Sequence, residues 1–184
     1  MLEKFKKSLV ESYVVKRGNY DYFVNPLTSG VLEIKPEIIK EICESIISCV
    51  DIKTFNVIIT IEAMGIHITS VLSQMTGIPF NIVRKRSQHT PEEIVLKNVT
   101  GYGTSNLYMS LPKNEKVLIV DSVVSTGGTL ISVINGLKKL NADIKDIVCV
   151  IERGNGVKKV KEKTNYDVKT LVKIDIKNGK VVLV

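Results

Sequence analysis

Runs of apolar residues and helically spaced apolar stripes alternate along most of the chain. The uninterrupted runs, rich in β-branched residues, predict buried strands over residues 55–61, 78–83, 116–120 and 144–151. Apolar positions that recur at a helical spacing predict helices over about 36–50, 66–76, 128–140 and 157–163. This alternation of strands and helices predicts an α/β fold, in which helices flank a central parallel sheet.

Residues 1–35 precede this rhythm and differ from it. A helical stripe covers about 2–12, and an aromatic segment, Tyr13–Pro26, follows with a turn signal at Gly18-Asn19. We interpret the aromatic segment as a short strand pair. This strand pair either only packs against the rest of the protein or forms a hood over a ligand base.

A long interruption over residues 84–110 separates two of the predicted strands. Apolar residues at 94–96 and 106–109 predict two antiparallel strands within it. Insertions of this length in compact domains are usually functional loops or disordered segments. A hairpin is also predicted at the C-terminal end, where Asn178-Gly179 is typical of a tight turn.

Composition narrows the class of protein. A length of 184 residues predicts one domain over 1–184, and 44% apolar with 24% charged residues is typical of a soluble globular protein. No apolar run is long enough to cross a membrane and no hydrophobic signal core follows the N-terminus, so we expect a cytoplasmic protein with no membrane partner. The three cysteines lack the spacing of a metal site, which argues against zinc.

The net charge of +7 has several interpretations. A basic protein attracts nucleic acid, but it also suits a polyanionic small substrate, and a lysine-coated face is often merely solvated. The lysines are spread along the chain and cluster only around residues 157–163. Charge alone therefore does not favour a nucleic-acid partner, and we expect none.

The segment Val117–Thr129 carries the strongest chemical signal. An apolar strand, Val117–Val120, is followed by Asp121 and then by a turn rich in glycine and hydroxyl groups. A strand, a short turn and a helix together point backbone N–H groups at an anion, and an acid at the strand end can accept hydrogen bonds from sugar hydroxyls. This pattern indicates a sugar-phosphate site. The alternative is an ordinary turn whose Gly and Ser/Thr residues only cap the helix.

Two more predicted strands are followed by segments whose residues suit ligand binding, Glu62–Gly65 and Arg84–Arg86. Ligands of open α/β sheets bind beyond the carboxyl ends of the strands, where these segments and the turn after Asp121 should converge. One segment offers a phosphate cradle, one a turn of small residues and one three cations. A ligand with phosphate at two ends and a sugar between them fits this set.

The segment Val117–Thr129 resembles the signature with which type I phosphoribosyltransferases bind 5-phosphoribosyl 1-pyrophosphate (PRPP). The resemblance extends from about Val14 to Ile151 and is strongest to adenine and to archaeal hypoxanthine/guanine phosphoribosyltransferases. It implies the type I phosphoribosyltransferase fold, with an N-terminal helix and hood over residues 1–35 and a flexible antiparallel loop insertion over 84–110. It also implies Mg²⁺ carried by PRPP without direct protein ligands, a purine base as second substrate, and a homodimer.

The resemblance assigns roles to residues of this chain. It implies that PRPP phosphate and ribose are bound by Asp121, Ser122, Ser125, Thr126, Gly127, Gly128 and Thr129. The pyrophosphate is bound by Glu62, Ala63, Met64, Gly65, Arg84, Lys85 and Arg86. The purine is bound by Tyr22, Phe23 and Val24, and the catalytic residues are Asp121, Lys85 and Arg86.

Four positions depart from related patterns. Ser122 stands where the PRPP signature has a second acid, and Met64 and Gly101 replace an Arg and an acid of adenine enzymes. Ser125 stands where mammalian-type 6-oxopurine enzymes have a catalytic Asp, which leaves the proton acceptor open. Met64 and Gly101 favour the archaeal branch, and hence transfer to hypoxanthine, with guanine as a further substrate, giving IMP or GMP. The alternatives are an adenine phosphoribosyltransferase and, on account of Ser122, a non-catalytic PRPP-sensing regulator.

Overall fold

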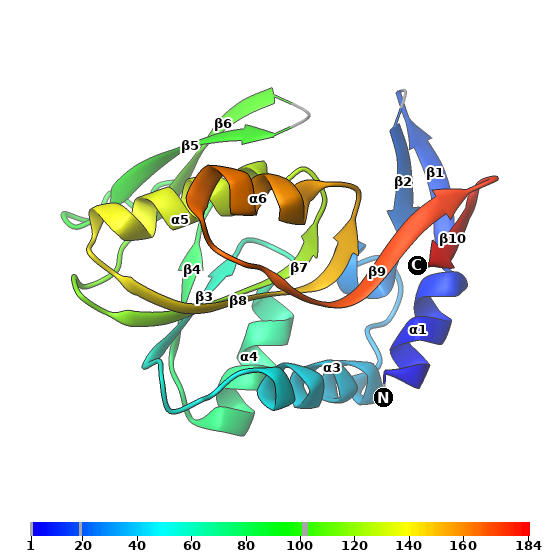
Figure 1. The fold of residues 1–184 in the computed structure, drawn as a ribbon, viewed down its shortest axis with the longest axis horizontal. Helices are drawn as coiled ribbons and strands as arrows, with labels where there is room; N and C mark the ends of the chain where they lie inside the picture. The colour runs from blue at the N-terminus through cyan, green and yellow to red at the C-terminus, as the bar shows by residue number, and fades with distance from the viewer. Residues whose placement is uncertain (1, 19, 101–102) are drawn as a thin grey trace.

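The computed structural model describes residues 2–18, 20–100 and 103–184, and its centre is a mostly parallel sheet (Figure 1). Among the described residues, six strands form this sheet in the order β10-β9-β8-β7-β3-β4. Their bounds are β3 Val57–Ile61, β4 Phe80–Val83, β7 Lys116–Val124, β8 Asp143–Arg153, β9 Lys169–Lys177 and β10 Lys180–Leu183. Only β10 pairs antiparallel with its neighbour, through the hairpin predicted at Asn178-Gly179. The predicted α/β fold is confirmed.

Helices pack on both faces of the sheet. One face is covered by α5 (Gly128–Lys139) and α6 (Gly156–Thr164). The other is covered by α3 (Pro36–Cys49), α4 (Ile66–Thr76) and α1 (Glu3–Val10). Two separate apolar cores result, one on each face. All five residues of strand β3 are buried because the strand lies between the two cores.

Two hairpins extend from the same side of the sheet (Figure 1). The N-terminal one, here called the hood, consists of β1 (Tyr13–Arg17) and β2 (Tyr20–Val24) and leads into a short helix α2 (Pro26–Ser29). The other, here called the flap, consists of β5 (Ile94–Thr100) and β6 (Gly103–Met109). Both pairs were predicted, whereas α2 is too short for a helical stripe to reveal it.

The base of the flap is part of the protein core. Leu96 and Leu107 are both almost fully buried, and a Cβ on Gly136 of α5 would collide with the Leu96 side chain. The Ser132 hydroxyl of α5 also donates to the Lys97 carbonyl at 2.8 Å. Core packing and this hydrogen bond therefore fix how β5 lies along α5.

Strand β7 is longer than predicted. The apolar run indicates a strand ending at Val120, but pairing with β8 continues from Asp121↔Cys149 to Val124↔Glu152. The reason is that β8 extends equally far and offers backbone partners, while β-branched Val123 and Val124 suit a pleated strand. Asp121 consequently lies inside a strand, and only three residues, 125–127, connect β7 to α5.

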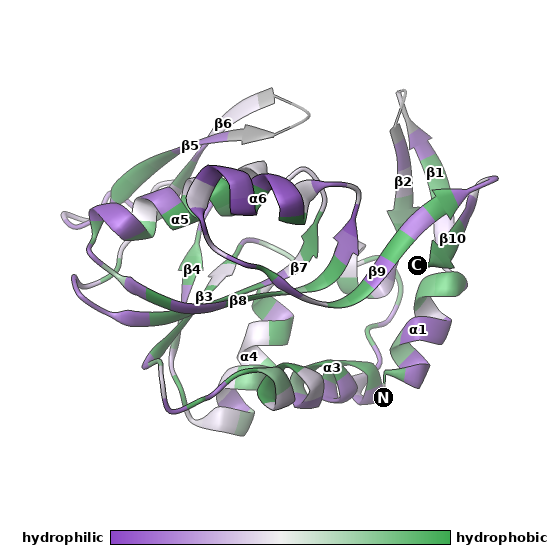
Figure 2. Cartoon of the chain, in the orientation of Figure 1, coloured by the Kyte–Doolittle hydropathy of each residue, from purple (hydrophilic) through white to green (hydrophobic). Residues whose placement is uncertain are grey.

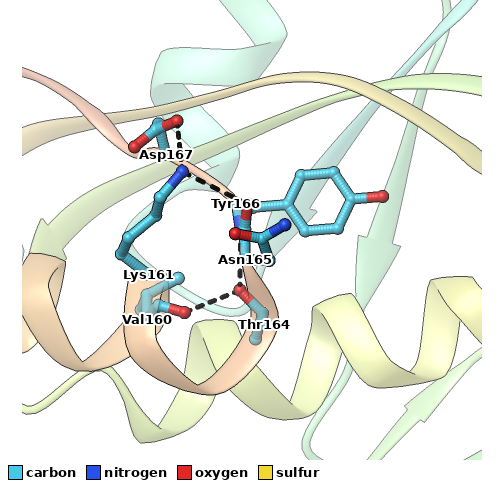
Figure 3. Close-up of polar contacts among 6 residues, drawn as sticks. All are labelled: Val160, Lys161, Thr164, Asn165, Tyr166 and Asp167. Carbon is cyan, nitrogen blue, oxygen red and sulfur yellow. Dashed lines mark hydrogen bonds and ion pairs between the residues drawn. The ribbon is translucent and has the colours of Figure 1, made fainter.

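Side-chain contacts at the C-terminal end of α6 fix this helix (Figure 3). The buried Thr164 hydroxyl donates to the Val160 carbonyl at 2.7 Å and accepts from the Tyr166 N–H at 3.3 Å. Lys161 Nζ lies 2.7 Å from Asp167 Oδ2. Figure 2 shows α6 as mainly hydrophilic, and Val160 is its fully buried side chain in the core of this face. This anchoring matters because the other end of α6 touches the candidate site.

Candidate active site

A cavity of about 440 Å³ lies beyond the carboxyl ends of β3, β7 and β8, with the hood and the flap contributing to its walls. This is the position expected for a ligand site in an open α/β sheet. Residues singled out in the sequence line much of it: Tyr22, Phe23, Glu62, Ala63, Met64, Lys85, Asp121, Ser122, Ser125, Thr126, Gly127, Gly128 and Thr129. The predicted convergence of three strand ends is therefore present in the structure.

The turn Ser125–Gly127 and the first residues of α5 form one wall. Gly127 has φ 79°, a left-handed conformation that favours glycine, and a Cβ there would lie 2.7 Å from the Gly156 carbonyl. A Cβ on Gly156 would in turn collide with the Ser125 backbone. Two glycines therefore let the N-terminal end of α6 support the turn. The N-terminal N–H groups of α5 follow directly, which suits an anion.

Asp121 is the carboxylate at the centre of the cavity wall. Burial raises its pKa to about 7, although the Ser122 backbone N–H at 2.7 Å, the Ser122 side chain and the positive charge of Lys85 oppose that rise. Ser122 itself is 6% exposed. The residue that stands in place of a second acid thus supports Asp121 instead of adding a second charge to the cavity.

The turn Glu62–Gly65 forms the wall beside the phosphate turn. Glu62 Oε2 accepts a hydrogen bond from the Lys85 N–H at 2.8 Å, which joins two of the predicted segments. A Cβ on Gly65 would collide with Thr60 Oγ1, so the turn lies tightly against β3 and Gly65 does not border the cavity. The turn is therefore held by β3 on one side and by the Lys85 backbone on the other.

Of the three predicted cations, only Lys85 borders the cavity. Arg84 and Arg86 are exposed beside it, and the Arg84 backbone bridges to Tyr108 of β6. The hydrogen bond from the Lys85 N–H to Glu62 holds Lys85 beside the turn Glu62–Gly65, whereas the Arg84 backbone pairs with the flap. The pattern of three successive cations therefore places one charge in the cavity wall.

The hood closes the opposite end of the cavity. Tyr22 and Phe23 border it, whereas Val24 borders a separate cavity on the outer side of the hood. Arg153, at the end of β8, also borders the cavity and donates from Nη1 to the Asp21 carbonyl at 2.6 Å. This hydrogen bond joins residues 132 positions apart and ties the hood to the central sheet.

Several cavity residues were not singled out by the sequence. Thr28 follows the hood, and Asn98, Ser105 and Leu107 belong to the flap. Their position becomes clear only from the pairing of β5 with β6. Asn98 pairs with Ser105 and Leu96 with Leu107, so these four residues share one face of the hairpin. Gly101, which replaces an acid of adenine enzymes, lies outside the described residues.

Neither a metal cluster nor a membrane span is found in the part of the chain that the structure describes. Residues 2–18, 20–100 and 103–184 contain no group of three or more His, Cys, Asp or Glu side chains that could hold a metal ion. No helix among them is both long and apolar enough to span a bilayer.

Cys43 and Cys149 are buried in the core, and burial raises the pKa of the Cys43 thiol to about 12.

Comparison with known structures supports the fold. An adenine phosphoribosyltransferase from Thermoanaerobacter pseudethanolicus superposes with a TM-score of 0.78 over 94% of this chain and 99% of its own, at 22% identity. The enzyme from Saccharomyces cerevisiae, complexed with an imino-altritol bisphosphate and adenine, gives 0.77 over 92% and 98%, at 18% identity. At these identities the likeness concerns the fold.

Comparison of sequences supports the family. The phosphoribosyl transferase domain matches residues 30–184. A hypoxanthine/guanine phosphoribosyltransferase from Methanothermus fervidus is 48% identical over 100% of this chain and 98% of its own length. One from Methanothermococcus okinawensis is 52% identical over 92% and 93%. The chain therefore belongs to the phosphoribosyltransferase family.

Proposed function

We propose that this protein transfers the 5-phosphoribosyl group of PRPP to hypoxanthine, and also to guanine, giving IMP or GMP and pyrophosphate in purine salvage. One observation carries the proposal: a single cavity joins a phosphate-binding turn, a carboxylate, a cationic segment and an aromatic hood. These walls match, in order, the phosphate, ribose, pyrophosphate and base of the reactants. The relatives that share about half of the sequence carry the same activity in their names.

At the phosphoribosyl end, we assign phosphate binding to Ser125–Thr129, through backbone N–H groups and hydroxyls. Asp121 accepts hydrogen bonds from the ribose hydroxyls, and Ser122 holds its carboxylate in place. The reaction passes through a transition state with positive charge developing at C1 of the ribose. A fixed carboxylate nearby stabilises that charge because it needs no reorganisation as the bond breaks.

At the pyrophosphate end, Lys85 and the turn Glu62–Gly65 bind the leaving group, and the exposed Arg84 and Arg86 beside the cavity add positive charge that attracts it. The cavity wall fits Mg²⁺ carried by PRPP, since Mg²⁺ keeps several waters and the carboxylates of Glu62 and Asp121 can accept hydrogen bonds from them. When bound, Mg²⁺ neutralises part of the charge on the departing pyrophosphate. The positive charge of Lys85 lies at the same place and lowers the free energy needed for the pyrophosphate to leave.

At the base end, Tyr22 and Phe23 pack against the purine, and the hood backbone up to Val24 contacts its edge. A purine nitrogen then attacks C1 on the face opposite the pyrophosphate, with inversion. Hood and flap together exclude water, which would otherwise capture the developing cation. The Arg153–Asp21 hydrogen bond keeps the hood in position for this packing.

A steady-state assay with PRPP, Mg²⁺ and each of hypoxanthine, guanine, adenine and xanthine tests the proposal. We expect pyrophosphate release with hypoxanthine and guanine. Turnover with adenine alone would make the protein an adenine phosphoribosyltransferase. PRPP binding without pyrophosphate release from any base would instead identify a PRPP-sensing regulator of the same fold.

The proposal includes an assembly and a location. We infer a homodimer that acts in the cytoplasm, with no nucleic-acid or membrane partner, on the pattern of the family. Sedimentation equilibrium checks the dimer, and a single species of 20.4 kDa would contradict it.

A further inference from the structure

Asn98 is a buried polar residue in the wall of the cavity. It lies on the inner face of the flap, opposite Ser105 in the β5–β6 register, and its side chain is 6% exposed. Both residues border the cavity together with the turn Ser125–Gly127 and the start of α5. Val95, on the outer face of the same strand, is 53% exposed. Asn98 is therefore one of few polar side chains that the flap turns inward.

The Asn98 amide lacks one hydrogen bond. Its Nδ2 donates to Ser105 Oγ at 3.3 Å, and its Oδ1 is buried without a hydrogen-bond partner among the residues that the structure describes. Exchanging the two ends of the amide would pair Oδ1 with the Ser105 hydroxyl but leave the NH₂ group unpaired. In either orientation, one end of a buried amide has no partner, which typically costs free energy comparable to a lost hydrogen bond.

The packing of the flap carries this amide toward the phosphate-binding turn. Leu96 meets Gly136 of α5, and the next residue, Lys97, accepts a hydrogen bond from Ser132, one turn closer to the N-terminal end of that helix. As β5 advances, it therefore runs toward the first turn of α5. Asn98 continues this course and borders the same cavity as Thr129 and Leu130.

We propose that Asn98, together with Ser105, is a substrate-contacting pair that binds the 5-phosphoribosyl group from the flap side. The amide offers an NH₂ donor to a phosphate oxygen or an oxygen acceptor to a ribose hydroxyl, and rotation about its last side-chain bond selects between them. Ligand binding then supplies the missing hydrogen bond. The inference rests on the proposed function for the identity of the ligand, and it adds a third wall to a subsite otherwise built from β7 and α5.

Calorimetric titration with ribose 5-phosphate and, separately, with pyrophosphate tests the pair. We expect Asn98→Leu to weaken ribose 5-phosphate about tenfold, the loss typical of one hydrogen bond to a charged group, and to leave pyrophosphate affinity unchanged. The same variant should melt no lower than the wild type, because an apolar side chain of similar size removes an unpaired buried group. The KM for PRPP should rise while the KM for hypoxanthine stays constant.

Two further variants complete the test. Once Asn98→Leu has lost affinity, Asn98→Asp, which keeps an acceptor but adds negative charge, identifies the partner: ribose 5-phosphate affinity falls at least as far if the partner is phosphate and returns toward the wild-type value if it is a ribose hydroxyl. Val95→Ala, on the outer face of the same strand, should match the wild type in every measurement. Ribose 5-phosphate affinity unchanged in Asn98→Leu, or equal losses for ribose 5-phosphate and pyrophosphate with a lower melting temperature, would overturn the inference.

The two proposals fail separately. If wild-type protein releases no pyrophosphate with any purine, the proposed transfer reaction is wrong, yet the titrations with ribose 5-phosphate still decide the role of Asn98. If the wild type turns over and Asn98→Leu retains the wild-type KM for PRPP, the reaction stands and the flap contact is wrong.

Discussion

The two ends of the cavity are built in different ways. The phosphoribosyl end consists of residues 121–129, which follow one another in the chain and are supported by Gly156 through backbone contact. The base end consists of a hairpin that buries Phe23 in the core of one face and accepts a hydrogen bond from Arg153 at the end of β8. The first end is held by covalent neighbours and close packing, the second by contacts between segments far apart in the chain. We infer that the tightly packed sugar-phosphate end tolerates little change, whereas the choice of base can vary at little cost to the fold.

Asp121→Asn should have the largest effect, and it should fall on the phosphoribosyl end. Losing one preorganised electrostatic contact costs on the order of 3 kcal/mol of transition-state stabilisation, roughly a hundredfold in turnover. Steady-state kinetics with saturating hypoxanthine measure this. Full turnover on PRPP in the variant would show that Asp121 has no catalytic role.

Gly156→Ala should weaken the same end through packing alone. The added methyl group collides with the Ser125 backbone, and overpacking of this kind costs about 2 kcal/mol, or roughly thirtyfold if it falls entirely on PRPP binding. The KM for PRPP should rise while the KM for hypoxanthine is unaffected. Asn155→Ala is the matched control, because the Asn155 side chain makes no capping hydrogen bond.

Equal changes in both KM values for Gly156→Ala would contradict the comparison, since they would show that the two ends are not held independently. A lower melting temperature with both KM values unchanged would mean that the turn Ser125–Gly127 keeps its shape at the expense of stability.

Arg153→Ala should affect the base end instead. Removing the hydrogen bond to the Asp21 carbonyl frees the hood, and a typical net loss of about 1 kcal/mol raises the KM for hypoxanthine roughly fivefold. The KM for PRPP should remain at its wild-type value. Arg153→Lys, which restores a cation without the planar guanidinium, separates lost charge from lost geometry.

The pH dependence should be the smallest of these effects. The pKa of Asp121 is raised by burial to about 7, so its ionised form, which stabilises positive charge, grows as pH rises through that value. At limiting PRPP, kcat/KM should increase about twofold between pH 7 and pH 8 and then level off, by ordinary titration of one such group. Asp121→Asn should abolish this rise. A profile that falls over the same range would assign the titration to another group.

Folding stability should depend on pH through Asp121 in the opposite sense to a carboxylate whose pKa is lowered by folding. Because the folded pKa of Asp121 lies above its usual value, the folded protein binds this proton more tightly than the unfolded chain does. The contribution of this group to stability is therefore present at low pH and is lost as pH rises from about 4 to about 7. A site that ionises for catalysis thus loses some folding stability.

The sequence predicts the phosphoribosyl end better than the base end, for a physical reason. Ser125–Thr129 are contiguous, so their local order already determines a turn at a helix N-terminus, and all five residues border the cavity. The end of β7 was predicted wrongly, because its last four residues are extended by pairing with β8, a contact that local sequence does not encode. Which of the three successive cations borders the cavity depends on the contacts of Arg84 with Tyr108 and of Lys85 with Glu62, which local sequence does not encode either.

Residues whose position depends on tertiary register escaped prediction. Asn98 and Ser105 are ordinary polar residues until the flap pairs and its apolar members enter the core, which turns both toward the cavity. The hydrogen bond from Arg153 to the hood escaped prediction as well, because Asp21 lies 132 residues earlier in the chain. Single-sequence patterns describe such residues only after the fold is known.

The hydrogen bond from Arg153 to Asp21 has a consequence for the order in which the protein folds. Contacts between residues far apart in sequence close the largest loops, whose entropic cost must be met before the contact is rewarded. The carbonyl of Asp21 is synthesised 132 residues before the guanidinium that binds it. During synthesis the hood therefore gains this contact only once β8 is complete, and the helix end at Gly156 that supports the sugar-phosphate turn emerges directly afterwards.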